Sequence, residues 1–284
     1  MENNPVAEHI AHHLRIPVLP NSALQLIKAL TSEDIGFREL SNVVNQHPSI
    51  AARLLALANS AWAAPLVPVL TVENACARLG LNVVRSVSLG LAVIAPFNTA
   101  NCPAFDLKQF WASSMLVAEG SGLLAAGVSG YEKNSMFHQT AQTAGLLHNL
   151  GLLCLADVMP KETHEAFQAV SHDHLTIIDA LRLKAKTDYC EIGSLVGNAW
   201  GLPKVFVVAM GHHHEAAYHE EFWQVSTLVG CVVHAVQHLF DGLEMLPYEP
   251  RLTELAVDPQ YYGEVYEKLG AKLNKFQSMA NDLF

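Results

Sequence analysis

Apolar residues recur every three or four positions along most of this 284-residue chain, and no stretch shows a convincing strand-like alternation. A spacing near 3.6 residues predicts amphipathic helices. The 51% apolar composition is enough for a sizeable core. The sequence therefore predicts an all-α fold, with its clearest stripes at Leu24, Ile27 and Leu30; at Phe37, Leu40 and Val44; at Ile50, Leu54 and Leu57; and at Tyr262, Val265, Leu269, Leu273 and Phe276.

Several helix ends carry recognisable capping residues. Thr71 is a candidate N-cap, and Gly80 is a candidate end for the same helix. Asn82 and Asp106 are candidate N-caps of two later helices. The segment 101–104, Asn-Cys-Pro-Ala, is predicted to be a hinge between two halves of the chain.

The segment 222–240 has no charged residue and is long enough to cross a bilayer. Six polar residues gather on one side of it, so we interpret it as an amphipathic core helix. The first thirteen residues are polar and histidine-rich, unlike a secretory leader. The five cysteines are widely spaced and odd in number, which is typical of reduced, buried residues. These features predict a cytoplasmic protein with no membrane partner.

The net charge argues against nucleic-acid binding. The chain has 17 Lys and Arg against 27 Asp and Glu, a formal charge of −10. Affinity for a phosphate backbone comes largely from clustered cations, and the sequence contains no such cluster.

The segment 138–151, HQTAQTAGLLHNLG, places a histidine beside a carboxamide, His148 and Asn149. It resembles the HD-superfamily motif, in which Leu-Leu-His-Asp-hydrophobic-Gly binds a divalent metal through the His-Asp pair. Here Asn149 stands at the aspartate position. A neutral carboxamide offers a metal only a weak carbonyl oxygen, so the substitution argues against hydrolytic chemistry. The alternative is that His148 is simply a structural histidine near a helix end.

The wider pattern resembles the HDOD family, the HD-related output domains. In the first half the resemblance lies in IPVLPNSALQLIKAL, ELSNVVNQHPSIAARLLALANSAW and VENACARLGLNVVRSVSLGLAV. In the second half it lies in the order Trp111-x-x-Ser114, Leu147-His148-Asn149, Glu191-Ile192-Gly193, Trp200-x-Leu202-Pro203 and His213-His214-Glu215.

This resemblance implies a multi-helix fold in which an N-terminal helical half, 14–103, packs on an HD-like half, 104–245. The two halves together form an HDOD domain over 14–245. We expect a flexible N-terminus over 1–13, and a C-terminal helical extension over 246–284 that the resemblance does not cover.

The metal ligands of catalytic HD proteins carry over to a degenerate set: Ser113, His148, Asn149, Tyr189, His213, His214 and Gln237. At most three of these residues would ligate a metal, so we expect neither a metal nor any other cofactor. The alternative is a rewired site in which His148 joins His213 or His214 and also His234 or His238. Five of the degenerate set, Ser113, His148, Asn149, Tyr189 and His213, are expected to line a pocket that either binds a small ligand or is filled core.

By resemblance, the chain is expected to be a non-catalytic regulatory module that acts through a protein partner in bacterial signal transduction. The alternative is a metal-dependent phosphohydrolase or phosphodiesterase with the rewired histidine site. A third hypothesis, nucleotide or cyclic-dinucleotide sensing, would need basic residues near the pocket to meet phosphates, and Arg85, Lys108 and Lys204 are the nearest candidates by sequence. The charged content is only 15%, and the helix predicted over 260–279 carries an apolar stripe, so self-association or partner docking is also expected.

Overall fold

The computed structural model describes residues 16–30, 36–60, 62–65, 67–131, 134–173, 175–243 and 248–284. Helices dominate these ranges and no strand occurs within them, which confirms the predicted all-α class. The expected flexible segment 1–13 lies outside the described residues.

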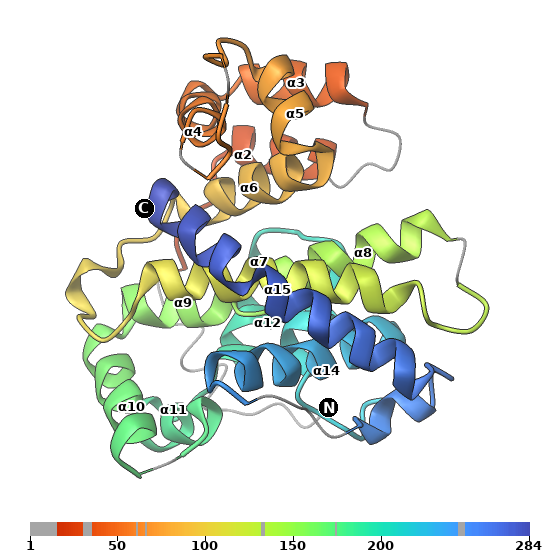
Figure 1. The fold of residues 1–284 in the computed structure, drawn as a ribbon. Coiled ribbons are helices and arrows are strands. Elements are labelled where there is room, and N and C mark those ends of the chain that lie inside the picture. The colour runs from red at the N-terminus through yellow and green to blue at the C-terminus, as the bar shows by residue number, and fades with distance from the viewer. Residues whose placement is uncertain are drawn as a thin grey trace.

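The first group of helices forms the upper part of the molecule in Figure 1. The residues predicted to face the core do so, and Leu30, Leu40, Leu54 and Leu57 are each 0% exposed. The group consists of α2 (Asn21–Leu30), α3 (Phe37–Asn45), α4 (Pro48–Ala58), α5 (Val72–Leu79) and α6 (Leu81–Ile94).

The predicted boundary around Thr71 and Gly80 is confirmed. Thr71 Oγ1 accepts a hydrogen bond from Asn74 N at 3.1 Å, and Gly80 ends α5 with φ +88°. The prediction that Asn82 caps the next helix is wrong, because Gly80 itself precedes α6 and Leu81 is already helical. A glycine tolerates this positive φ, so the chain turns without a separate capping residue.

The second group begins after the short helix η1 (Thr99–Asn101) and the predicted hinge. As predicted, Asp106 caps its first helix, accepting from Lys108 N and Gln109 N at 2.9 and 3.0 Å. The group consists of α7 (Leu107–Ala125), α8 (Ser135–Leu147), α9 (Leu150–Val158), α10 (Pro160–Asp173), α11 (Ile177–Ala185), α12 (Tyr189–Ala199), α13 (Lys204–His212) and α14 (Trp223–Phe240).

The C-terminal extension continues through η2 (Pro250–Thr253) into α15 (Pro259–Leu283), which crosses the second group and ends near the first (Figure 1). Its apolar stripe packs mainly on α7. Arg53 Nη1, on α4, donates to Leu283 O at 2.6 Å, so the end of α15 also ties the two groups together. Since Leu269 and Met279 are 0% exposed, the stripe that the sequence offered for self-association is covered within the chain.

The segment 222–240 forms α14, whose apolar residues are buried, including Val229 at 0% exposure. Among the described helices, none is by itself both long and apolar enough to cross a bilayer. In each of two sharply bent helix pairs, the two helices combined reach the length and apolar composition of such a span. All five cysteines are free and buried, as the sequence predicts.

Candidate functional site

The His148-Asn149 pair lies at the corner between α8 and α9. His148 follows the last residue of α8, and Asn149 immediately precedes α9. The His148 ring is 3% exposed, and its Nδ1 lies 2.7 Å from Gly145 O. A carbonyl oxygen only accepts, so Nδ1 carries the hydrogen and donates it.

Tyr189 and Cys190 are positioned by the start of α12. Asp188, 1% exposed, caps this helix by accepting from Cys190 N at 2.8 Å and Glu191 N at 3.0 Å. Arg182 Nε donates to the same carboxylate at 2.8 Å. The cap and the ion pair together fix the first turn of α12, so both side chains point inward and are buried.

The double histidine follows the end of α13. His213, 1% exposed, donates from Nδ1 to Ala209 O at 2.8 Å, so its Nε2 remains an acceptor. Arg251 Nη1, from η2, donates to His213 O at 3.2 Å. A Cβ on Gly230 would lie 1.9 Å from that oxygen, so only glycine allows α14 to approach so closely.

The Tyr189 hydroxyl lies between the two histidines. Its oxygen is 3.2 Å from His213 Nε2 and makes a short hydrogen bond with His214 Nε2. Because His213 Nε2 has no hydrogen, both contacts are satisfied when the phenol donates to His213 and accepts from His214. The two nitrogens that would face a metal are therefore occupied by one tyrosine oxygen.

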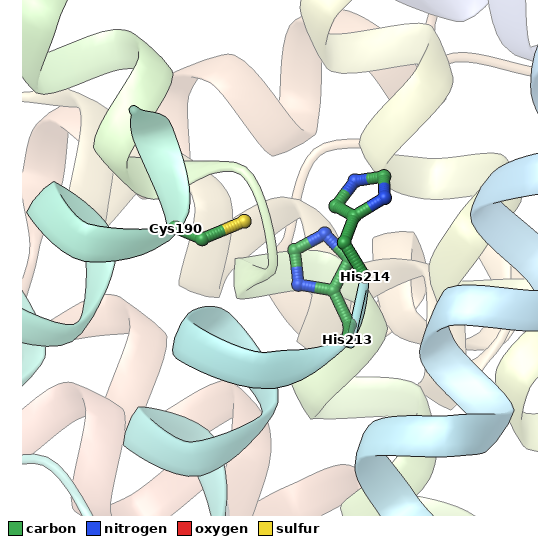
Figure 2. A group of neighbouring side chains, drawn as sticks. All are labelled: Cys190, His213 and His214. Carbon is green, nitrogen blue, oxygen red and sulfur yellow. The ribbon is translucent and has the colours of Figure 1, made fainter. Parts of the chain in front are cut away.

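Cys190 completes a group of three potential metal ligands. Figure 2 shows its sulfur directed toward the rings of His213 and His214, and ligand atoms of the three residues lie within 4.8 Å of one another. A thiolate and two imidazoles suit zinc. Burial raises the pKa of the Cys190 thiol, so it is protonated at neutral pH.

Burial also keeps the histidines neutral. Desolvation lowers the pKa of His148 to about 4, of His213 to about 3 and of His214 to about 2. The rings add to one another's shifts, since those of His148 and His213 lie 5.3 Å apart, and those of His213 and His214 lie 4.4 Å apart.

We expect the free energy of unfolding to fall steeply as the pH drops below about 6.5, where histidines of the unfolded chain become charged. Each ring that stays neutral in the folded protein costs about 1.4 kcal/mol per pH unit below that value. The loss continues until the folded pKa is reached. Urea unfolding of the wild type and of His213→Gln between pH 7 and 4.5 measures it, and His213→Gln should show the shallower decline. His212→Gln, a neighbour outside the buried group, is the control, and an equal decline in all three proteins would contradict the assignment.

The predicted degenerate set falls into two groups in the structure. His148, Tyr189, His213 and His214 form the buried cluster. Ser113, Asn149 and Gln237 instead line a neighbouring cavity of about 480 Å³. Asn149 Oδ1 accepts from Ser114 Oγ at 3.1 Å, so the residue on α7 that contacts the motif is Ser114, next to the position carried over from the family.

The cavity does not favour phosphates. Among the described residues, its lining contains neither Lys nor Arg, and the carboxylate of Asp106 is already used as a helix cap. Of the three cations considered for nucleotide sensing, Arg85 and Lys108 line other pockets, and Lys204 pairs with Glu221. The geometry gives the nucleotide-sensing hypothesis no support.

The rewired histidine site is not assembled in the described structure. His234 is exposed, its ring centre lies 6.1 Å from that of His214, and its Nδ1 lies 3.2 Å from Glu249 Oε2. His238, one turn further along α14, makes no ring contact with the buried cluster within the described ranges. Of the five histidines in this alternative, the other three, His148, His213 and His214, do lie together.

The set carried over from the family lacks three residues of the site: Ser114, Cys190 and Arg251. Ser114 directly follows Ser113, and Cys190 directly follows Tyr189, two residues that were carried over from the family. Neighbouring residues of a helix point in different directions, so an alignment shifted by one position names a different side chain for the site. Arg251 lies in the extension, for which the family pattern offered no guide.

The chain matches the family model for the HDOD domain over residues 16–216. No curated protein matches it significantly. A candidate signal-transduction protein from Marinobacter aquaeolei VT8 shares the fold with a TM-score of 0.80 and 22% identity. That similarity covers 96% of this chain and 61% of the Marinobacter chain, so the present chain spans about three fifths of that relative.

Two further solved structures are similar over nearly their whole length. An HDOD domain protein of unknown function from Geobacter sulfurreducens gives a TM-score of 0.73 at 20% identity, with 99% of this chain and 97% of that chain covered. A candidate phosphohydrolase from Shewanella amazonensis SB2B gives 0.71 at 23% identity, with 99% of both chains covered. At these identities the structures show the shared helical fold. The family match spans well over half of the 284 residues, and the chain therefore belongs to the HDOD family.

Proposed function

We propose that this protein is a non-catalytic regulatory module of bacterial signal transduction, which acts in the cytoplasm through a protein partner. Its HDOD membership and the signal-transduction relative from Marinobacter support a signalling role. The non-catalytic part of the proposal rests on the buried cluster.

The observation that carries the proposal is the position of the Tyr189 hydroxyl. It makes hydrogen bonds to Nε2 of both His213 and His214, the nitrogens that a hydrolytic metal would need. A metal would have to displace a buried phenol, and no carboxylate is among the residues of the cluster. Water activation requires a firmly held metal with an open coordination position, and this cluster offers neither.

We expect the wild type to hydrolyse neither a generic phosphodiester nor cyclic dinucleotides above background, with Mn²⁺, Mg²⁺, Fe²⁺ or Ni²⁺ supplied. Asn149→Asp alone should also stay at background, because Tyr189 still blocks the histidines and Ser113 and Gln237 supply no strong ligand. Product formation over time measures both proteins. Wild-type turnover that disappears in His148→Ala would overturn the proposal and favour the phosphohydrolase alternative.

The partner is tested by recovering the tagged protein from its native host and identifying what co-purifies. Leu183→Glu on α11 and Met136→Glu on α8 each place a charge on an exposed apolar residue, 54% and 55% exposed respectively. Loss of a co-purifying protein in one of these folded variants would locate the contact. Recovery of no specific protein by the wild type would count against the proposal.

A further inference from the structure

Arg85 is a buried arginine without a carboxylate partner among the described residues. It lies on α6 and is 6% exposed. Its Nη1 donates to Gln139 Oε1 at 2.7 Å, whereas its Nε is buried with no hydrogen-bond partner. One neutral amide is therefore the only acceptor that the described chain offers to a guanidinium.

Such an arrangement is costly. Burial of an unpaired cation is strongly unfavourable, and buried charges in proteins are generally paired. Burial also lowers the pKa of Arg85, and no carboxylate of the described residues offsets that effect. The chain carries ten more acidic than basic groups, yet no described acidic residue is placed here.

The guanidinium lines a pocket of about 190 Å³. Polar groups come from α8, which presents Gln139, Thr140 and Thr143 on one face. The remaining lining is apolar. It consists of Leu30 from α2, Met136 from α8, Val205 and Phe206 from α13, and Pro203, which precedes α13. The pocket thus has a cationic, hydrogen-bonding side and an apolar side.

We propose that this pocket binds a small organic carboxylate with an apolar body, whose carboxylate pairs with Arg85. A guanidinium matches a carboxylate geometrically, and charge-assisted hydrogen bonds of this kind are the strong ones. The two threonines offer hydroxyl donors, and Leu30 and Phe206 offer apolar contact. A phosphate monoester is disfavoured, because it carries close to two charges and Arg85 is the only cation among the described residues of the lining.

The site lies between the two groups of helices. Arg85 and Leu30 come from α6 and α2 of the first group, whereas the α8 residues and Phe206 come from the second. Figure 1 shows α6 at the base of the first group, facing the second. A bound carboxylate would therefore link the two groups through Arg85. This site is separate from the histidine cluster, and the proposal does not depend on the proposed function.

Calorimetric titration and thermal unfolding of the full chain test the proposal, with benzoate and hexanoate as probes at constant ionic strength. Both carboxylates should bind the wild type and raise its thermal midpoint, whereas benzamide and inorganic phosphate should not. Arg85→Met should weaken binding by at least about tenfold, because it removes the charged pair. Without a probe, this variant should unfold at the same temperature as the wild type or higher, because it removes a buried charge.

Arg38→Met is the matched control, since Arg38 is an exposed arginine of the same helical group. It should bind both probes as the wild type does. Absence of binding to the wild type, or equal binding by Arg85→Met, would overturn the proposal and leave a water-filled pocket. Glu33 and Asp34 lie outside the described residues, so Glu33→Gln with Asp34→Asn is also needed. If this double variant gains probe affinity, an internal carboxylate already serves Arg85 and the proposal fails.

Discussion

Replacing Gly151 by alanine is expected to lower the free energy of unfolding by about 3 kcal/mol or more. This is the upper end of the usual cost of adding a methyl group to a tightly packed core. A Cβ at this position would lie 2.0 Å from Tyr189 O and 2.4 Å from Gly193 N. Both are backbone atoms at the contact between α9 and α12, so no side-chain rotation relieves the clash. The helices would have to separate, and Tyr189 would move with its backbone.

Gly193→Ala is the matched control for this experiment. It lies on α12 opposite Gly151, but its Cβ would approach nothing closer than Met210 Cβ at 3.4 Å, which is ordinary contact. Alanine is a better helix former than glycine by about 1 kcal/mol, so this variant should be as stable as the wild type or slightly more so. Urea unfolding of the three proteins measures both effects. Equal stability of the two variants would show that the close helix contact at Gly151 is absent in solution.

The helices were largely predictable because their apolar residues repeat with the helical period. The stripe Leu54 and Leu57 and the stripe of 222–240 are buried as the period requires. The Asn82 error has a local cause. Asparagine is a common N-cap, but the backbone turn at Gly80 already starts α6, and a turn of this kind depends on φ rather than on a side-chain pattern.

The extension shows a second limit of the sequence. The stripe of 260–279 predicts a helix correctly, but an amphipathic pattern does not say what covers its apolar face. In the structure α7 covers it, and Tyr261 OH donates to Leu123 O at 2.7 Å, a contact between residues far apart in the chain. Long-range contacts of this kind decide whether a stripe is core or surface.

The site was predictable by position and not by geometry. The family pattern places Tyr189, His213 and His214 in one region, but it does not reveal that the phenol forms hydrogen bonds to both rings. It also does not predict that Asn149 lines a neighbouring cavity. Nor does it predict that Arg251 of the extension donates a hydrogen bond to His213 O. These facts depend on distances of a few ångströms between different helices, and sequence spacing within one helix carries no such information.

Tyr189→Phe is expected to raise the affinity of the protein for Co²⁺ and Zn²⁺ by at least about tenfold. The change removes only the hydroxyl oxygen, so Nε2 of His213 and of His214 loses its hydrogen-bond partner. Leaving such buried groups unsatisfied costs about 1 to 3 kcal/mol, and a metal would recover that energy. Cys190 supplies the third ligand, because metal binding deprotonates a coordinating thiol.

Titration with Co²⁺ measures this gain, because a cobalt–thiolate bond gives an absorption band that identifies Cys190 as a ligand. The band should appear in Tyr189→Phe at metal concentrations where the wild type shows none. It should disappear when Cys190→Ser is added. His234→Gln in the same background is the matched control and should keep the band, since His234 is exposed and already contacts Glu249. Equal cobalt affinity of the wild type and Tyr189→Phe would mean that the hydrogen bonds of the tyrosine hydroxyl do not keep a metal off the two histidines.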